Sequence, residues 1–394
     1  MTKNYYFDYN ATTPVAESVL QAMLPYFREH YGNPSSLHSR GRGAAKAVRE
    51  ARKSVAAIIG AQDEKEVIFT GCGTESNNTA IRSALAAYPE KRQVITSAVE
   101  HSSIRKLARQ LQKEGYEIRE IGVSAQGFLN IDELRRYLSA DTAVVSLMLA
   151  NNETGVLFPI EEIGRFVKER GALFHVDAVQ AAGKHRLNVS QSSIDYMSLS
   201  AHKLYGPKGV GALYVREGVP FQPIFCGGAQ ERGRRAGTEN VAGVVGFGEA
   251  CKLALSDLNE EILRLKSLRR LFEESLCEGL GGAVVNGDLT RRIPTTSNLR
   301  FPGMDGEALM MALDQRGICA SSGSACLSGS SEPSHVLKAM GLTDEEANAS
   351  LRFSFGRFKT EEDIRGAVEI IRETLQYFRE LDSKSILNSD GAAI

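Results

Sequence analysis

Two residues with complementary chemistry follow two β-rich runs in the middle of the sequence. Lys203 ends the tetrapeptide Ser-Ala-His-Lys after the run 196–199, and Asp177 follows the run 173–176. A lysine in a partly desolvated site can attack an aldehyde, and an aspartate directed at a pyridine nitrogen keeps that nitrogen protonated. A lysine before a glycine-rich turn is usually a surface residue, but this pair at neighbouring strand ends fits a pyridoxal phosphate site.

The same region contains residues suited to bind an anion and to move protons. Gly73 and Thr74 stand at the expected start of a helix after the run 67–70, where backbone N–H groups and the helix dipole favour a phosphate. Simple N-capping by Thr74 or Ser76 is the alternative, and no Gly-Lys-Ser/Thr follows, so this is no P-loop. His101 follows another strand run; it is either structural or able to stack on a pyridine ring and move protons.

Cys326 is the reactive side chain of a segment rich in serine and glycine. Residues 321–332 contain six Ser and two Gly, a composition typical of a flexible chain. The segment offers none of the apolar surroundings in which structural cysteines lie. We expect this thiol to collect a group in a pocket and deliver it elsewhere; an incidental exposed thiol is the alternative.

Arg352 lies in the alternating run 351–355 of a second β-rich region. Its planar fork suits a substrate carboxylate. A surface ion pair is an equally good interpretation at this level.

The elements that would position these residues alternate along residues 60–215. Strand runs are expected at residues 67–70, 93–96, 142–147, 173–176, 196–199 and 211–215, with helical patterns such as 103–114 and 160–170 between them. Alternating strands and helices predict a largely parallel sheet covered on both faces, with ligands beyond the carboxyl ends of its strands. Polar clusters follow five of these strands, which predicts one shared site.

The rest of the chain predicts a smaller second unit. A single helical pattern covers about residues 241–280, and its charged second half is interpreted as a solvated connector. The order β, α, loop, β, α after it predicts a smaller α+β domain, completed by the N-terminal segment. The expected domains are a large one at 15–260 and a small one formed by 1–14 and 261–394, which carries a mobile cysteine segment at 321–332.

Composition and charge exclude several classes of protein. The chain has 394 residues, 42% hydrophobic and 24% charged, which is globular rather than disordered. Its 47 Lys plus Arg against 48 Asp plus Glu leave a net charge of −1, so no nucleic-acid partner is expected. The absence of a long apolar run, of a secretory pattern and of CxxC pairs among six cysteines predicts a reduced cytoplasmic protein without a membrane partner.

Together these residues resemble the cysteine desulfurases of the nitrogen-fixation and iron–sulfur-cluster type, group I, within the fold-type I pyridoxal-phosphate enzymes of aminotransferase class V. The resemblance runs from Phe7 to about Phe378. It rests on short motifs at residues 7–14, 32–36, 73–78, 100–101, 151–153, 175–180, 200–203, 234–238 and 321–335. It implies an α/β fold with a mainly parallel seven-stranded sheet flanked by helices, plus the smaller α+β domain. Cys72 and Ala229 depart from the expected pattern without removing a catalytic group.

The resemblance also implies a role for each site residue. Lys203 would hold pyridoxal 5'-phosphate and move the substrate α-proton, Asp177 would pair with the pyridine nitrogen, and His101 would stack on the ring. Gln180 would bond the ring hydroxyl. The phosphate would be held by Gly73, Thr74, Ser200 and His202, with Thr238 supplied by the second subunit of a homodimer. Asn152, which also contacts the cofactor, and Arg352 would bind the substrate carboxylate.

The implied activity is the conversion of L-cysteine to L-alanine, with the sulfur held as a persulfide on Cys326. The persulfide would pass to an iron–sulfur scaffold or another sulfur acceptor protein. No resident metal is expected, Cys326 being at most a transient iron–sulfur ligand. Two alternatives stay open: a selenocysteine lyase or other β-eliminating relative, and a non-catalytic dimer that serves as a delivery platform or regulator.

Overall fold

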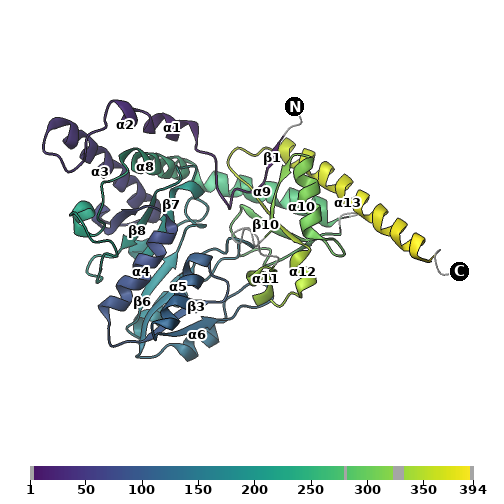
Figure 1. Cartoon of the computed structure of the whole chain (residues 1–394), viewed down its shortest axis with the longest axis horizontal. Coiled ribbons are helices and arrows are strands. Elements are labelled where there is room, and N and C mark those ends of the chain that lie inside the picture. The colour runs from purple at the N-terminus through teal and green to yellow at the C-terminus, as the bar shows by residue number, and fades with distance from the viewer. Residues whose placement is uncertain (1–3, 279–281, 323–331, 391–394) are drawn as a thin grey trace.

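The structure is a computed structural model of the chain. It describes residues 4–278, 282–322 and 332–390, with side chains as far as residue 381. These residues form a seven-stranded, a four-stranded and a two-stranded sheet with helices packed around them (Figure 1). No helix in this part of the chain is long and apolar enough to cross a membrane.

The seven-stranded sheet has the strand order β2-β8-β7-β6-β5-β3-β4. Its strands are β2 (Val67–Thr70), β3 (Gln93–Ser97), β4 (Glu117–Ile121), β5 (Thr142–Met148), β6 (Leu173–Asp177), β7 (Tyr196–Ser200) and β8 (Gly211–Val215). Strands β3 to β7 pair in parallel, and β8 runs antiparallel to both of its neighbours. The predicted mainly parallel sheet is therefore confirmed. Strand β4, at the edge, was not among the predicted strands.

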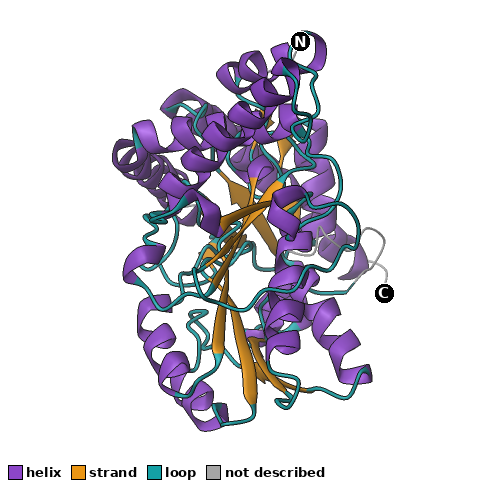
Figure 2. Cartoon of the chain, turned by 90° about the vertical axis from the view of Figure 1, so that its left-hand side faces the viewer, coloured by secondary structure: helices purple, strands orange, loops and turns teal. Residues whose placement is uncertain are grey.

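Helices cover both faces of this sheet, and each face has its own apolar core (Figure 2). One face is covered by α4 (Gly73–Ala87) and α5 (Ser102–Lys113). The other is covered by α1 (Glu17–Met23), α3 (Ser39–Ile59), α6 (Ile131–Tyr137), α7 (Ile160–Glu169) and α8 (Val241–Ser256). Helix α3 ends at Gly60, whose φ of 66° is the left-handed conformation that glycine adopts without strain. The short helix α2 (Pro25–Arg28) lies between α1 and α3 in the chain.

The prediction of a single helix over residues 241–280 is wrong. The chain leaves the helical conformation at Asp257, with φ −142° and ψ 24°, between α8 and α9 (Leu258–Cys277). The Arg357 guanidinium donates to both Asp257 carboxylate oxygens, at 2.6 and 3.1 Å, which holds the break. Helix α9 also buries Leu265 and Phe272, so it is part of a core rather than a solvated connector.

The smaller sheet has the order β12-β13-β10-β9, with antiparallel pairs throughout. Its strands are β9 (Val284–Val285), β10 (Thr296–Arg300), β12 (Ser321–Ser322) and β13 (Ser350–Ser354), and beside it β1 (Tyr5–Tyr6) pairs in parallel with β11 (Ile318–Cys319). The helices here are α9, α10 (Gly306–Gln315), α11 (His335–Ala339), α12 (Asp344–Asn348) and α13 (Glu361–Asp390). The core includes Phe7, whose ring lies 5.6 Å from that of Phe272. The N-terminal segment thus packs with C-terminal elements, while the exact domain boundaries stay a prediction.

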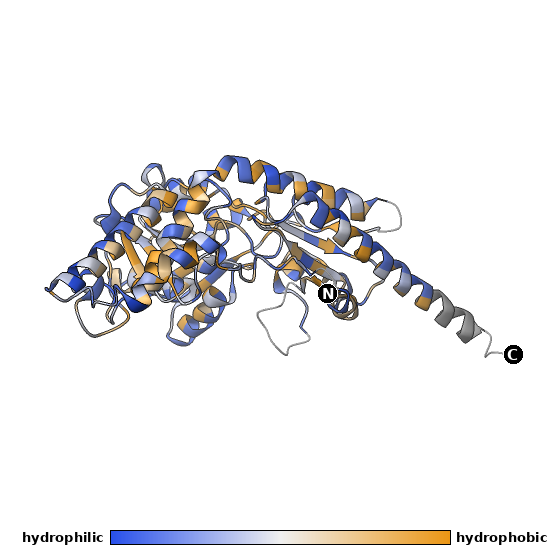
Figure 3. Ribbon diagram, turned by 90° about the horizontal axis from the view of Figure 1, so that it is seen from above, coloured by the Kyte–Doolittle hydropathy of each residue, from blue (hydrophilic) through white to orange (hydrophobic). Residues whose placement is uncertain are grey.

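Helix α13 is amphipathic and projects from the rest of the chain (Figure 3). Ile364, Val368 and Ile371 face the core and are buried, whereas Tyr377 and Leu381 are exposed. This spacing of buried residues is that of one helical face.

The described connections include the short 3-10 helices η1 (Glu64–Glu66), η2 (Val189–Gln191), η3 (Ala201–Lys203) and η4 (Gln230–Gly233). The third, η3, follows β7 directly and carries Lys203. It is held by the N-terminal segment, because Thr13 donates from both its backbone N–H and its hydroxyl to the His202 carbonyl, each at 3.0 Å.

Candidate active site

A cavity of about 260 Å³ lies at the carboxyl ends of β5, β6 and β7. It is lined by Ala11, Cys72, Gly73, Thr74, Asn77, His101, Ser103, Met148, Ala150, Asn152, Asp177, Val179, Gln180, Ser200, His202 and Lys203. The strand-end site expected from the sequence is therefore present. Of the predicted site residues, Arg352 and Thr238 do not line the cavity, and Cys326 lies outside the described residues.

Asp177, the last residue of β6, presents a buried carboxylate to this cavity. Asn77 of α4 donates from Nδ2 to one carboxylate oxygen at 2.7 Å, and the Val179 N–H donates to the other at 3.0 Å. A fixed negative charge is thus directed at whatever occupies the cavity.

His101 precedes α5 and faces the same space. Its Nδ1 accepts from the Ser103 N–H at 3.2 Å and lies 2.9 Å from the Ser103 hydroxyl, which also accepts from Asn77. Burial lowers the pKa of His101, although the charge of Asp177 opposes this. The ring is therefore neutral near pH 7, and because Nδ1 accepts, its proton lies on Nε2.

Lys203 reaches the cavity from η3. Its Nζ donates to the carbonyl oxygens of Asn10 and Ala11, the second at 2.7 Å. The turn continues through Tyr205, whose φ of 64° is unusual for a residue with a side chain. Thr13 accepts from the Tyr205 N–H at 2.8 Å and so holds this strained conformation. The N-terminal motif thus fixes both the lysine amine and the turn that carries it.

His202 is neutral as well. Burial, with the positive charges of Lys203 and its neighbours, lowers the pKa of His202 to about 4. Its Nδ1 lies 3.1 Å from the Thr12 hydroxyl. A neutral imidazole can still donate one hydrogen bond to an anion without adding charge.

The residues around the start of α4 form a cradle that fits a phosphate. The 15-residue helix begins at Gly73, and a Cβ added there would lie 2.9 Å from Val179 Cγ2, so only glycine leaves the approach open. Helix N–H groups and the adjacent Ser200 hydroxyl and His202 imidazole are suitable donors. Together with the Asp177 carboxylate and the Lys203 amine, this donor set matches what pyridoxal phosphate requires. The cap of α4 is Cys72, whose Sγ accepts from the Glu75 N–H, and not Thr74 or Ser76.

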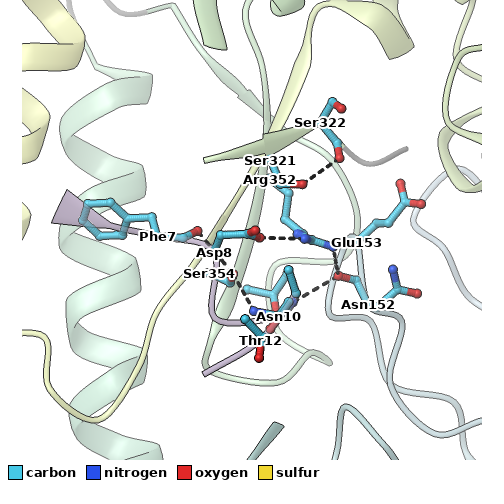
Figure 4. Close-up of polar contacts among 12 residues, drawn as sticks. Phe7, Asp8, Asn10, Thr12, Asn152, Glu153, Ser321, Ser322, Arg352 and Ser354 are labelled. Carbon is cyan, nitrogen blue, oxygen red and sulfur yellow. Dashed lines mark hydrogen bonds and ion pairs between the residues drawn. The ribbon is translucent and has the colours of Figure 1, made fainter. Parts of the chain in front are cut away.

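Arg352 lies beside the cavity on β13 and is already engaged (Figure 4). Its Nη2 donates to Asp8 Oδ1 at 2.8 Å and its Nη1 to the Asn152 carbonyl at 3.1 Å, while Nε has no hydrogen-bond partner among the described residues. Asn10 donates to the same carbonyl at 3.0 Å. The guanidinium is thus fixed next to Asn152, with an N–H left over for a further acceptor.

Thr238 is exposed and lies outside this cavity. Nearby residues of its loop are tied to helices that cover the large sheet, because Arg235 pairs with Glu75 of α4 at 3.0 Å and the buried Glu231 pairs with Arg52 of α3 at 2.5 Å. Thr238 therefore does not serve the cavity of its own chain.

The segment that follows residues 323–331 is anchored on residues adjacent to the site. The Ser334 hydroxyl donates to Glu153 at 2.5 Å, and His335 Nε2 donates to the Glu100 carbonyl at 3.0 Å. Glu153 follows Asn152, and Glu100 precedes His101. Burial raises the pKa of Glu153 to about 7.

Several functional contacts could not be foreseen from the sequence. Asn77 and Ser103 support Asp177 and His101, and Asp8 holds Arg352. Asn77 and Asp8 fall inside the motifs at residues 73–78 and 7–14. The sequence therefore pointed to these two residues but not to the residues that they contact. Lys184, which donates to Gln180, carried no signal at all.

Glu100 gives the site a pH-dependent contribution to stability. This fully buried carboxyl accepts from Ser97 at 2.6 Å and from the Met148 N–H at 3.0 Å, while its second oxygen has no partner in the part of the chain that the structure describes. Burial raises the pKa of Glu100 to about 8, against both hydrogen bonds. The folded chain therefore binds this proton more tightly than the unfolded chain. The resulting stabilisation is complete below the unfolded pKa of about 4.3 and is lost as the pH rises through the folded value.

We therefore expect Glu100→Gln to become more stable relative to wild type as the pH rises. The amide keeps the shape and cannot ionise, so the difference in unfolding free energy should grow by up to about 1.4 kcal/mol per pH unit between about pH 5 and about pH 8. Urea unfolding across this range measures it. The exposed Glu307→Gln serves as the control and should show no such trend. A constant difference for Glu100→Gln would contradict the assigned protonation.

Comparison with known proteins agrees with this geometry. Residues 5–366 match the family model described as aminotransferase class-V, a class of enzymes that generally depend on pyridoxal phosphate. A cysteine desulfurase of Nostoc sp. (strain PCC 7120) is 52% identical over 376 residues, covering 95% of this chain and 94% of the relative. Cysteine desulfurase NifS of Azotobacter vinelandii is 48% identical over 368 residues, covering 93% and 91%. A solved structure titled NifS-like protein superposes with a TM-score of 0.90 at 37% identity, covering 95% of this chain and all of that one.

These similarities span nearly the whole chain. The chain therefore belongs to the cysteine desulfurases of the aminotransferase class-V family. Its fold is that of the fold-type I enzymes, as the motifs predicted.

Proposed function

We propose that the protein converts L-cysteine to L-alanine with pyridoxal 5'-phosphate and keeps the sulfur as a persulfide on Cys326 for iron–sulfur cluster assembly. The observation that carries this proposal is the cavity in which the Lys203 amine, the Asp177 carboxylate and the start of α4 face one space. The cysteine desulfurase relatives support it.

The cavity residues divide into those that would bind the cofactor and those that would tune it. Gly73, Thr74, Ser200 and His202 bind the phosphate. Asp177 holds a proton on the pyridine nitrogen, and Gln180 donates to the ring oxygen. His101 covers the ring. When bound, pyridoxal phosphate supplies an aldehyde for the amino group and an electron-withdrawing ring that stabilises negative charge on the substrate α-carbon.

Substrate binding and proton transfer fall to Arg352, Asn152, Lys203 and His101. Arg352 and Asn152 take the substrate carboxylate, for which Arg352 offers its unpartnered Nε–H and a fixed position. Lys203 accepts the α-proton, and the neutral His101 is placed to move a second proton. The low exposure of the Asp177 and Arg352 side chains strengthens each of these polar contacts.

Sulfur transfer balances without an added oxidant. The Cys326 thiolate attacks the sulfur of the substrate, the C–S bond breaks, and its electron pair stays with the carbon that becomes the methyl group of alanine. The products are alanine and a Cys326 persulfide, in which the sulfur is ready for an acceptor protein. We propose that Thr238 of a second subunit completes the phosphate site, which would make the enzyme a homodimer.

The test is mass spectrometry of the purified holoprotein after treatment with L-cysteine. We expect one or more added sulfur atoms on the peptide that contains Cys326, together with alanine in the solution. The Cys326→Ser variant should carry no added sulfur, whereas Cys277→Ser should behave as wild type. Sulfur found on another cysteine, or alanine formed without any persulfide, would contradict the assignment. Alanine released from selenocysteine but not from cysteine would instead favour a selenocysteine lyase.

A further inference from the structure

Lys184 is a buried ammonium that no proposed step uses. Its side chain donates from Nζ to Gln180 Oε1 at 3.1 Å and is 8% exposed. Within the described ranges no carboxylate pairs with it, and the charges that face it are those of Lys203 and Arg352. Burial and these two cations lower the pKa of Lys184 to about 7. A buried cation among cations is unfavourable, so its contact with Gln180 calls for a functional explanation.

The turn after β6, which carries Lys184, packs against the turn that carries Lys203. Gly183 has a φ of 69°, and a Cβ added there would lie 2.4 Å from Leu204 Cδ2. Leu204 is the residue after Lys203, so the two turns are in direct contact. The backbone N–H of Lys184 donates to the Ala181 carbonyl at 3.0 Å, which closes the turn.

Two neighbours determine how the Gln180 amide is oriented. Protonated Lys184 can only donate, so the Gln180 atom next to it is the oxygen. The Asn10 carbonyl can only accept, and Gln180 Nε2 donates to it at 2.9 Å. Nε2 carries two hydrogens, and the Asn10 carbonyl takes one of them. The second N–H is left for an acceptor in the cavity that Gln180 lines.

We propose that Lys184 is a positioning residue, which fixes the Gln180 amide with its N–H side toward the cavity and so selects an acceptor oxygen on the bound cofactor. This role presupposes the proposed function, since it needs a cofactor with such an oxygen. The Asn10 carbonyl alone would hold the amide less firmly, because that carbonyl also accepts from Lys203. Lys184 also adds a positive charge near the amine of Lys203.

Two substitutions separate the hydrogen bond from the charge. Lys184→Met removes both, while Lys184→Gln removes the charge and keeps a group that can donate to Gln180. The first should lower kcat about 10-fold, with a smaller change in KM, because the amide loses its orientation. The second should retain most of the wild-type kcat.

The visible absorbance of the holoenzyme provides a readout besides activity. Loss of a positive charge near Lys203 would favour protonation of its nitrogen. Both variants should therefore raise, by about half a unit, the pH midpoint at which the visible absorbance of the holoenzyme changes. Besides Lys203, the titratable groups that line the cavity are Cys72, His101, Asp177 and His202, and the charged Arg352 lies beside it. They are unchanged in both variants. Lys168→Met, at an exposed lysine of α7, is the control and should shift nothing.

A double-mutant cycle tests whether Lys184 acts through Gln180. In a Gln180→Leu background, Lys184→Met should change kcat by less than about twofold. An equal loss in both backgrounds, or an unshifted midpoint in both single variants, would overturn the inference.

Failure of the inference can be told apart from failure of the proposed function. A wild-type protein that takes up no cofactor or forms no alanine would refute the proposed function. A wild type that does both while Lys184→Met behaves identically would refute the role of Lys184 alone. Methionine fits the volume and removes a buried charge, so the holoenzyme melting temperature should not fall. If Lys184→Met nevertheless fails to fold, Lys184→Gln still tests the midpoint.

Discussion

Lys203→Ala is expected to lower kcat for alanine formation by about 10³-fold or more, because the variant lacks both the amine and the base. Among the described residues that line the cavity, Lys203 is the only lysine. Its Nζ is held by two backbone carbonyls of the N-terminal segment. No side chain from another element can take the place of this amine. Steady-state kinetics with L-cysteine and the visible spectrum of the purified protein measure the effect.

Lys203→Arg separates the positive charge of Lys203 from its action as a reactive amine and base. Arginine keeps the positive charge near the phosphate cradle but cannot lose its proton, so we expect the same loss as for alanine. The exposed Lys113→Ala of α5 is the matched control and should keep wild-type kinetics. If Lys203→Arg retained more than about a tenth of wild-type kcat, the lysine would act only as a charge.

The buried strands were predictable because each of them is a short, mostly apolar run. Strands β5, β6 and β7 are buried along their whole length, and continuous apolar runs between helices are typical of a parallel sheet. Strand β4 differs: its sequence Glu-Ile-Arg-Glu-Ile is largely exposed at the sheet edge. Charged residues on an edge strand prevent further pairing, and they also hide the strand from a search for apolar runs.

The break between α8 and α9 has one local signal, Asp257 three residues before Glu260, which is the pattern of an N-terminal capping box. No proline or glycine marks the break, and the Asp257 side chain makes no cap hydrogen bond. The break depends on Arg357, which is 100 residues away in the chain. A tertiary ion pair thus overrides a local preference.

The candidate site also contains residues that could be predicted from the sequence and residues that could not. Asp177 and Lys203 were predictable because each follows a strand of a sheet whose carboxyl ends share one edge. Their supports were not, because Asn77 meets Asp177 across 100 residues and Asn10 meets Lys203 across 193. Such contacts follow from how α4 and the N-terminal segment pack, which a residue pattern does not specify. The role of Thr238 in the site of a second subunit stays a prediction.

Asp177→Asn is the second substitution with a large expected effect. The variant keeps the size of the side chain but loses the negative charge that would hold a proton on the pyridine nitrogen. The present carboxylate accepts from Asn77 and from the Val179 N–H. An amide has one acceptor oxygen, so its Nδ2 must face one of these donors. We expect kcat to fall by about 10² to 10³, with a smaller change in KM.

This result would separate attachment of the cofactor from its activation. Asp177→Asn retains Lys203, so the holoprotein should remain coloured and its cofactor should still be trapped on a lysine by borohydride, whereas Lys203→Ala should lose both properties. The exposed Asp132→Asn of α6 should resemble wild type. Because the amide cannot hold the ring nitrogen protonated, the coloured variant should accumulate bound substrate without releasing alanine. Wild-type turnover in Asp177→Asn would mean that no charge on the ring nitrogen is needed. The role assigned to Asp177, which is to keep the ring electron-withdrawing, would then be wrong.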